Sequence, residues 1–285
     1  MSDPYELGED GVYRPPVPVT HRDEEYPSAG FESLLAMQER HFWYRGRHRF
    51  ILHFTRRIAP ALHKRQHVDA IDLGGGCGGW VSYLHRHAPT LFDQVALGDS
   101  SVQALNMAAS VLPRGVARYQ IDLLDLCWVE RWDAAFLLDV VEHLEEDVRA
   151  LRQVRMALRP GGLLFVTTPA LERFRTPIDD LSHHVRRYSR ADMARLASDA
   201  GLELVTSRYF MFFLSPLLWF SRRGIPDADR LTPTEAREYM RRSSQVPAAP
   251  LNGMLAGVMA LESPLGDWIP FPWGTSLLAV LRRAP

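Results

Sequence analysis

The feature that most constrains this chain is a glycine cluster that directly follows a short apolar run. Residues 68–73 read Val-Asp-Ala-Ile-Asp-Leu, and residues 74–79 read Gly-Gly-Gly-Cys-Gly-Gly. Glycine is needed where a turn requires unusual backbone dihedrals, or where a ligand must approach the backbone with no Cβ in the way. A helical pattern begins near Val81. The sequence therefore predicts a strand, a tight turn and a helix, which together form a nucleotide-type binding site.

Four further short apolar runs follow, and stretches with helical spacing lie between them. The predicted strands cover residues 94–98, 117–121, 133–138 and 163–168. Strands that alternate with helices require crossover connections, which build a parallel sheet with helices on both faces. We therefore predict a doubly wound α/β fold. Beyond it the sequence predicts a helix at 189–200, closed by Gly201, and strands at 202–209 and 275–281.

The remaining parts of the chain are expected to surround this core. Residues 1–28 are rich in Pro, Asp and Glu without a sustained period, so we expect a flexible arm with no catalytic role. Residues 29–64 carry apolar side chains at helical spacing and predict two helices. The core is expected at 65–285, with an inserted substrate cap at about 171–200 and 210–273.

Composition narrows the possible partners and location. The formal net charge is −1 over 285 residues, so no global field attracts a polyanion and we expect no nucleic-acid partner. The longest apolar run, residues 210–220, is about half of the roughly 20 residues that a membrane span needs, and Pro216 interrupts it, so we expect no integral membrane association. The acidic first residues lack a secretory pattern, which favours a cytoplasmic protein. Cys77 and Cys127 have no metal-type or disulfide spacing.

The glycine cluster alone does not identify the cofactor. Gly74, Gly76 and Gly79 satisfy the GxGxxG pattern of dinucleotide enzymes, so the cluster fits a nicotinamide cofactor and S-adenosylmethionine about equally. Asp99, at the end of the second predicted strand, suits the ribose hydroxyls of either cofactor. Asp122, at the end of the third, is placed to accept a hydrogen bond from an adenine amino group. The choice therefore depends on the rest of the chain.

The later motifs favour one of the two. Residues 133–144 read Asp-Ala-Ala-Phe-Leu-Leu-Asp-Val-Val-Glu-His-Leu, and residues 158–162 read Leu-Arg-Pro-Gly-Gly. With the Asp-Leu-Gly-x-Gly-x-Gly turn ahead of them, their order and separation resemble the class I S-adenosylmethionine-dependent methyltransferases. The resemblance implies a Rossmann-like sheet, mostly parallel with an antiparallel last strand, and an enzyme that uses S-adenosylmethionine. The extra glycines Gly75 and Gly79 depart from the family pattern and loosen the loop, but they leave its backbone geometry available.

The resemblance also implies which residues bind the cofactor. Those expected around its methionine part are Asp72, Gly74, Gly76, Gly78 and, through its backbone, Leu138. Those expected around its adenosine part are Asp99 and Ser100 at the ribose, and Asp122 and Leu123 at the adenine. These roles are carried over from the family's motifs.

The similarity extends upstream of the core. Residues 39–47, Glu-Arg-His-Phe-Trp-Tyr-Arg-Gly-Arg, resemble the His-Phe-Trp-[Phe/Tyr]-x-x-Arg entry helix of a bacterial subgroup, in which this helix closes over the cofactor. Arg45 or Arg47 could pair with the cofactor carboxylate, since a guanidinium fork suits that geometry. We take Tyr44 and Arg45 as the predicted contacts and Gly46 as the break between the two helices. The alternative is that this arginine is a surface residue of an amphipathic helix and that the aromatic rings of Trp43 and Tyr44 are packing residues rather than ligands.

A candidate general base follows the fifth predicted strand. Residues 179–188, Asp-Asp-Leu-Ser-His-His-Val-Arg-Arg-Tyr, resemble the subgroup's Asp-x-x-x-x-His-x-Arg-Arg-Tyr segment, in which His184 matches the motif histidine. Methyl transfer is an in-line displacement, so the enzyme must align the reacting atoms and remove a proton where the acceptor carries one. Histidine titrates near neutral pH and suits that task. Two alternatives stay open: a structural clasp of Asp179, His184 and Arg187, and a metal site, although we expect no metal.

Two further residues are candidates for the chemistry. His143 follows the fourth predicted strand, close to where the methyl group is expected to point. Glu172 follows Thr168-Pro-Ala and is a possible carboxylate base for a carbon acceptor, on position alone. We expect both to be secondary to His184.

The acceptor is the least constrained part of the prediction. The cap is rich in aromatic side chains, which suit an apolar or aromatic small molecule but equally form a core for the cap itself: Tyr209, Phe210, Phe212, Phe213, Trp219 and Phe220. The leading hypothesis is methyl transfer to an oxygen, nitrogen or carbon atom of a small molecule. The alternatives are a nicotinamide-dependent oxidoreductase and a non-catalytic protein that binds S-adenosylmethionine. The sequence does not indicate an oligomeric state.

Overall fold

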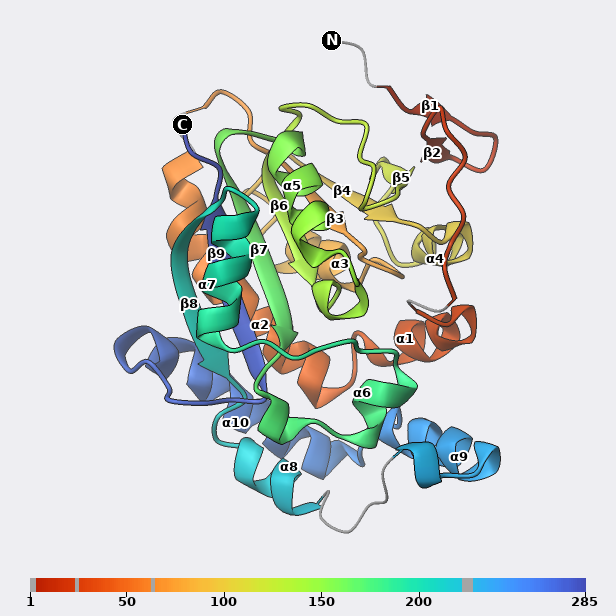
Figure 1. The fold of residues 1–285 in the computed structure, drawn as a ribbon, viewed down its shortest axis with the longest axis vertical. Coiled ribbons are helices and arrows are strands. Elements are labelled where there is room, and N and C mark those ends of the chain that lie inside the picture. Colours follow the sequence, from red (N-terminus) through yellow and green to blue (C-terminus); the bar gives the residue numbers. More distant parts are fainter. Residues whose placement is uncertain (1–3, 24–25, 63–64, 222–227) are drawn as a thin grey trace.

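The predicted strands lie side by side in a single twisted sheet in the computed structural model of the chain (Figure 1). The structure describes residues 4–23, 26–62, 65–221 and 228–285. Within these ranges the sheet has nine strands in the order β1-β2-β5-β4-β3-β6-β7-β9-β8. The strands are β1 (Glu6–Leu7), β2 (Val12–Arg14), β3 (Asp69–Leu73), β4 (Gln94–Asp99), β5 (Arg118–Gln120), β6 (Trp132–Leu138), β7 (Leu158–Pro169), β8 (Glu203–Phe210) and β9 (Ser276–Arg282).

Helices occupy both faces of this sheet and one of its ends. The helices are α1 (Phe31–Met37), α2 (Phe42–Ile58), α3 (Gly79–His87), α4 (Val102–Ala108), α5 (Asp147–Ala157), α6 (Pro177–Leu181), α7 (Arg190–Asp199), α8 (Ser215–Ser221), α9 (Pro233–Ser243) and α10 (Ala249–Trp268). A short 3-10 turn, η3 (Val141–His143), follows β6.

The pairing of the strands confirms the predicted fold class. Strands β5, β4, β3, β6 and β7 are parallel neighbours in that order. Strand β9 lies between β7 and β8 and is antiparallel to both, as expected of the last strand. Because parallel strands end at the same edge of a sheet, the loops after β3, β4, β5 and β6 come together at one end of the molecule.

Side chains alternate between two apolar cores, one on each face of the sheet. Phe136 of β6 packs in the core that also contains Phe50 of α2 and Trp80 of α3. The next residue, Leu137, packs in the opposite core with Leu151 of α5. Figure 1 shows α5 and α7 in front of the sheet. This two-residue alternation is what strands buried on both faces require.

Two short strands form within residues 4–23, where we expected a flexible arm over residues 1–28; residues 1–3 and 24–25 of that arm lie outside the described residues. Strands β1 and β2 form an antiparallel pair, and β2 adds to the sheet in parallel with β5, where Val12 pairs with Arg118. Tyr5 is buried and stacks on Trp128 with ring centroids 4.4 Å apart. The sequence analysis missed these strands because runs of two and three residues are too short to show a period, and β5, the partner of β2, lies about a hundred residues further along the chain.

Gly46 is not the break between the first two helices. It lies inside α2, and the break falls at residues 38–41. A Cβ at Gly46 would stand 2.4 Å from Cε of Met259 on α10, so glycine allows these two helices to approach closely. The start of α2 is marked instead by His41, whose side chain accepts a hydrogen bond from the Trp43 amide at 3.2 Å.

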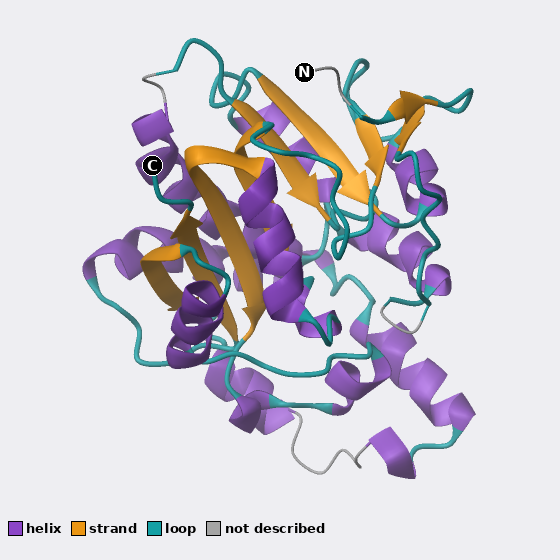
Figure 2. Cartoon of the chain, turned by 45° about the horizontal axis from the view of Figure 1, so that its top comes forward, coloured by secondary structure: helices purple, strands orange, loops and turns teal. Residues whose placement is uncertain are grey.

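Helices α6, α8 and α9 lie beyond the end of the sheet toward which the parallel strands point (Figure 2). The charged stretch near residue 234 forms α9, which begins with a capping box between Thr232 and Glu235. The boundary between core and cap stays a prediction. Among the helices that the structure describes, none is long and apolar enough to cross a membrane.

Candidate cofactor and acceptor site

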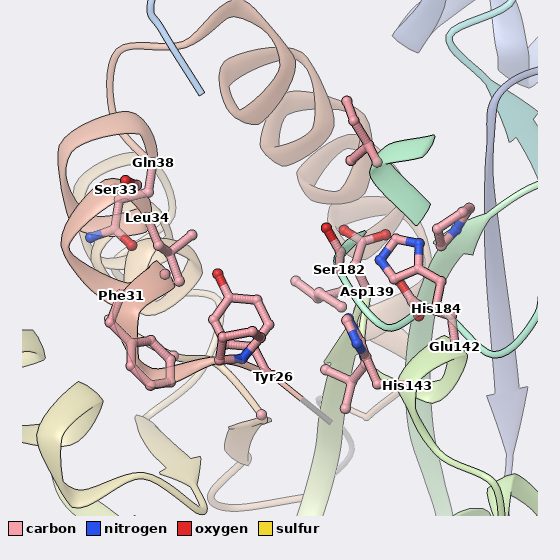
Figure 3. A pocket seen from close by; sticks show the side chains of 18 of the residues that line it. Tyr26, Phe31, Ser33, Leu34, Gln38, Asp139, Glu142, His143, Ser182 and His184 are labelled. Atoms are coloured by element: carbon pink, nitrogen blue, oxygen red, sulfur yellow. The ribbon is translucent and has the colours of Figure 1, made fainter. Parts of the chain in front are cut away.

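A cavity of about 900 Å³ lies at the carboxyl ends of the parallel strands. Its walls come from the N-terminal segment, α1, α2, the glycine turn, the loops after β4, β5 and β6, and the segments around α6 and α9. In Figure 3, Phe31 and Leu34 of α1 lie on one side of the cavity, together with Gln38, the residue that follows this helix. Glu142, His143 and His184 lie on the other, with Tyr26 between the two groups. The volume is within the range of small-molecule sites, about 300–1,000 Å³.

The glycine turn needs glycine for its conformation and for the groups packed on it. Gly74, Gly76 and Gly78 have φ angles of +70°, +53° and +74°, a region that side chains disfavour. The Gly74 amide donates to the Gly98 carbonyl at 2.8 Å and so ties the turn to β4. A Cβ at Gly75 would stand 2.4 Å from a carboxyl oxygen of Asp72. The turn therefore presents backbone to the cavity.

Two buried carboxyl groups flank the turn. Asp99 accepts hydrogen bonds from the Gly76 amide at 2.8 Å and from the Ser101 amide at 2.9 Å. Burial raises the pKa of Asp99, and these two hydrogen bonds counteract part of that effect. Burial also raises the pKa of Asp72 to about 8. Its Oδ1 atom has no hydrogen-bond partner among the described residues, as expected of an acceptor that awaits a donor from a ligand.

The N-terminal segment supplies cavity contacts that the sequence analysis missed. His21 Nδ1 lies 2.7 Å from the Ser100 hydroxyl, and Arg22 donates to Asp122 at 2.8 Å. Both partners are residues predicted to bind the adenosine part of the cofactor. No local signal marks His21, because a single histidine in a proline-rich segment forms no motif. It reaches Ser100 only because β2 joins the sheet beside β5.

Helix α1 lies directly on the glycine turn. Gln38 donates to the Cys77 carbonyl at 3.2 Å, and a Cβ at Gly76 would stand 2.9 Å from Leu34. The helix therefore covers the turn from the cavity side. Closure of this region over a bound cofactor stays a prediction.

Of the two candidate arginines of α2, Arg47 lines the cavity and Arg45 does not. Arg45 is exposed, whereas Tyr44 and Arg47 both line the cavity. Residues three apart share a face of a helix, and residues two apart do not. Arg47 forms an ion pair with Asp139, and its guanidinium lies 4.8 Å from the centre of the Trp43 ring. Arg45, which we took as the predicted contact, therefore points away from the cavity, and the alternative Arg47 is the residue that lines it.

Three side chains converge on the side of the cavity opposite α1. Glu142 and His143 belong to η3, and His184 belongs to the loop between α6 and α7. The rings of His143 and His184 meet edge to face with centroids 4.7 Å apart, and the Tyr26 ring lies 5.9 Å from His143. Glu142 is fully buried, which raises its pKa, and its carboxyl oxygens have no hydrogen-bond partner among the described residues. Two predicted catalytic candidates, His143 and His184, therefore share one site.

Asp179 holds the His184 loop in place. It accepts hydrogen bonds from His184 Nδ1 at 3.0 Å and from Arg187 Nε at 2.8 Å. Burial by itself raises the pKa of Asp179, but the His184 hydrogen bond and the Arg187 guanidinium outweigh it and hold the pKa below its usual value. The clasp that we considered as an alternative is present, and His184 lines the cavity at the same time.

Glu172 lies outside the site. Its side chain is 59% exposed and pairs with Arg175 at 3.2 Å. It belongs to a 3-10 turn after β7 that buries none of its residues. This position contradicts a role as catalytic base.

Most of the predicted cofactor residues do line the cavity: Tyr44, Asp72, Gly74, Gly76, Asp99, Ser100, Asp122, Leu123 and Leu138. Gly78 does not; it is the N-cap residue that precedes α3. The cavity therefore has a backbone-lined side with buried acceptors and, across from α1, a side with two histidines and a carboxyl group.

The family described as "Methyltransferase domain" matches residues 42–207, more than half of the chain. A Mycobacterium tuberculosis protein described as a probable S-adenosylmethionine-dependent methyltransferase is 28% identical over 206 residues, which are 67% of this chain and 70% of that protein. The tRNA U34 carboxymethyltransferase of Syntrophotalea carbinolica is 30% identical over 122 residues, 41% of this chain and 36% of that protein.

A solved structure shares the fold. This structure is the complex between the Haloferax volcanii Trm112 methyltransferase activator and a partner protein. One chain of the complex matches this chain with a TM-score of 0.55 and 18% sequence identity, and the match covers 93% of this chain and 97% of that one. These comparisons favour the methyltransferase hypothesis over the nicotinamide-dependent one. The chain therefore belongs to the family of S-adenosylmethionine-dependent methyltransferases.

Proposed function

We propose that this enzyme methylates a small-molecule acceptor, which binds between the glycine turn and the cluster of Glu142, His143 and His184. The observation that carries the proposal is that one cavity contains both the backbone-lined turn and a polar cluster placed across it. A methyltransferase needs these two halves in line, because the nucleophile must approach the methyl group from the side opposite the sulfur. When bound, S-adenosylmethionine supplies the methyl group on a positively charged sulfur.

The residues around the turn fit the cofactor. Asp99, at the end of β4, is placed to accept hydrogen bonds from ribose hydroxyls, and Asp72 Oδ1 is an acceptor without a partner among the described residues. Asp122 and Leu123 line the part of the cavity beside the ribose site, where we place the adenine. Arg47, already fixed by Asp139, is the cation that we place at the amino-acid end. Tyr44 shares its helix face and shields this end from water.

On the acceptor side, His184 is the group that we assign to the acceptor's proton. The Asp179 carboxylate fixes the Nδ1–H tautomer of the ring, so Nε2 is the nitrogen that can accept a proton. His143 lies beside it and positions the acceptor. Leu144, Ile178, Leu181 and Met240 also line the cavity, which favours an acceptor with an apolar part.

The first experiment is isothermal titration of the protein with S-adenosylmethionine and, separately, with NADH. We expect binding of the first alone. Asp99→Ala removes a buried charged acceptor, a loss of about 1.5–3 kcal/mol, so its affinity should fall about 10- to 100-fold. The matched control is Asp125→Ala, because Asp125 is exposed and outside the cavity. Binding of NADH, or equal affinities for both variants, contradicts the assignment of the turn.

The second experiment identifies the acceptor class. Formation of S-adenosylhomocysteine is followed with a small-molecule extract and, in parallel, with total tRNA, which is the class of acceptor named for the Syntrophotalea relative. We expect turnover with the extract, reduced about 10²- to 10⁴-fold by His184→Asn with unchanged cofactor affinity. Methylation of tRNA alone refutes the small-molecule proposal. No turnover with either pool favours a binding protein without catalysis.

A further inference from the structure

The cluster of Glu142, His143 and His184 has the composition of a metal site. Each residue offers one ligand atom, and these atoms all lie within 4.8 Å of one another. They come from two segments, η3 after β6 and the loop that precedes α7, and Figure 3 shows both facing the same part of the cavity. The Val185 amide donates to the Glu142 carbonyl at 2.8 Å, so a backbone hydrogen bond joins the two segments.

Glu142 is the strongest sign that a cation belongs here. Its side chain is 0% exposed, and neither carboxyl oxygen has a hydrogen-bond partner in the part of the chain that the structure describes. Buried carboxyl groups are normally hydrogen-bonded, paired with a cation or coordinated to a metal. The neighbouring guanidinium groups do not supply the partner, because Arg47 pairs with Asp139 and Arg187 with Asp179.

His184 is oriented as a metal ligand usually is. Metal-binding histidines generally donate their other ring N–H to a carboxylate, which fixes the ring and raises its basicity. The Asp179 carboxylate accepts such a bond from His184 Nδ1 at 3.0 Å, which leaves Nε2 for the cluster. Asp179 is itself held by Arg187 and Thr176, so the orientation does not depend on a ligand.

The separations allow coordination after small side-chain movements. Three atoms at the corners of a triangle with 4.8 Å sides lie about 2.8 Å from its centre. Zinc bonds to His nitrogen and Glu oxygen are about 2.0–2.2 Å long, so each atom has to move by at most about 0.8 Å. Rotation about side-chain torsions covers such a distance.

We propose that Glu142, His143 and His184 bind one divalent transition-metal ion, of which Zn²⁺ is the type case. One carboxylate and two imidazoles are the ligand set of catalytic zinc sites, which keep a further position open. That position faces the cavity, where an acceptor oxygen can bind and release its proton to solvent. This use of the ion rests on the proposed function, but its binding does not. With the ion bound, His184 acts as a ligand rather than as a base.

The test is titration of the full-length, chelator-treated protein with Zn²⁺ by calorimetry and with Co²⁺ by visible absorption, without S-adenosylmethionine. We expect one equivalent of Co²⁺ with ligand-field bands. Glu142→Gln keeps the shape of the side chain but removes the charge, and we expect it to weaken binding at least about 100-fold. Asp179→Asn keeps all three ligands and should weaken binding about 10- to 100-fold. Thermal melting of each variant checks that it is folded.

Two variants serve as matched controls. Glu172→Gln alters an exposed carboxylate outside the cavity, and His183→Asn alters the exposed histidine next to His184, with a residue that tolerates its φ of +60°. Both should bind Zn²⁺ like the unaltered protein. The proposal is overturned if the folded protein binds neither ion, or if Glu142→Gln binds with unchanged affinity. Titration of the same samples with S-adenosylmethionine reports separately on the proposed function.

Discussion

Asp179→Asn tests how the acceptor-side loop is held together. Oδ1 of Asp179 accepts from His184 Nδ1 and Arg187 Nε, at 3.0 and 2.8 Å. Oδ2 accepts from the Thr176 amide, the Thr176 hydroxyl and Arg187 Nη2, at 2.7, 3.0 and 3.0 Å. Asparagine keeps one acceptor oxygen and places an amide donor where the other was, so two or three of these five donors lose their acceptor. The Arg187 side chain is only 6% exposed and keeps its charge.

The expected destabilisation follows from that buried charge. Removing one partner of a buried ion pair costs about 3–5 kcal/mol. A chain of this size loses about 2–4 °C of melting temperature per kcal/mol, so the variant should melt about 6–20 °C lower at pH 7.5 by circular dichroism. Asp180→Asn is the matched control, since Asp180 is 43% exposed and pairs with Arg175 at the surface. Exposed pairs contribute about 1 kcal/mol or less.

The pH dependence gives a second check of the same reasoning. The pKa of Asp179 in the folded protein lies below its ordinary value of 3.8. Its contribution to stability is therefore complete above about pH 4 and is lost as the pH falls below that value. The difference in melting temperature between the unaltered protein and Asp179→Asn should therefore shrink as the pH falls below about 4. A difference below about 2 °C at pH 7.5 would refute the claim that this pair holds the loop.

Two further predictions concern buried positions. Gly46→Ala places a Cβ against Met259 and should destabilise the protein by about 1–3 kcal/mol in urea unfolding, whereas Gly257→Ala, where nothing lies within 4 Å, should be neutral or stabilising by up to about 1 kcal/mol. Equal effects of both substitutions contradict the packing argument. Asp72→Asn should raise the melting temperature of the cofactor-free protein by an amount that grows from about pH 4 to 8, because folded Asp72, with its pKa of about 8, retains a proton that the unfolded chain releases. A gain that does not change with pH contradicts the raised pKa.

The sequence predicted the parts of the fold that have a local signature. The strand at 69–73 and the glycine turn after it could be found because apolar residues and glycines are adjacent in the chain. The clasp of Asp179, His184 and Arg187 could be anticipated from a motif ten residues long. In each case the residues that act together are close in sequence.

The failures share the opposite property. The formation of β2 and the contact of His21 with Ser100 both depend on the pairing of β2 with β5, which is about a hundred residues away in the sequence. The need for glycine at position 46 depends on Met259, which packs against it. We chose Arg45 over Arg47 because the motif indicates a helix but does not indicate which face of that helix points toward the cavity. We proposed Glu172 only because it follows β7 closely in the sequence, and the 3-10 turn that contains it buries none of its residues. Tertiary pairing, rather than local propensity, decided these positions.

The place of β9 in the sheet has a consequence for biosynthesis. β9 lies between β7 and β8 and pairs with both along seven residues each, yet it is made after both and after α10. While the chain is being synthesised, β7 and β8 each have an edge with no neighbour, and such edges are sites of intermolecular pairing. A nascent chain that stalls before residue 276 should therefore be prone to aggregate, and it should depend on chaperones until the central gap in this half of the sheet is filled.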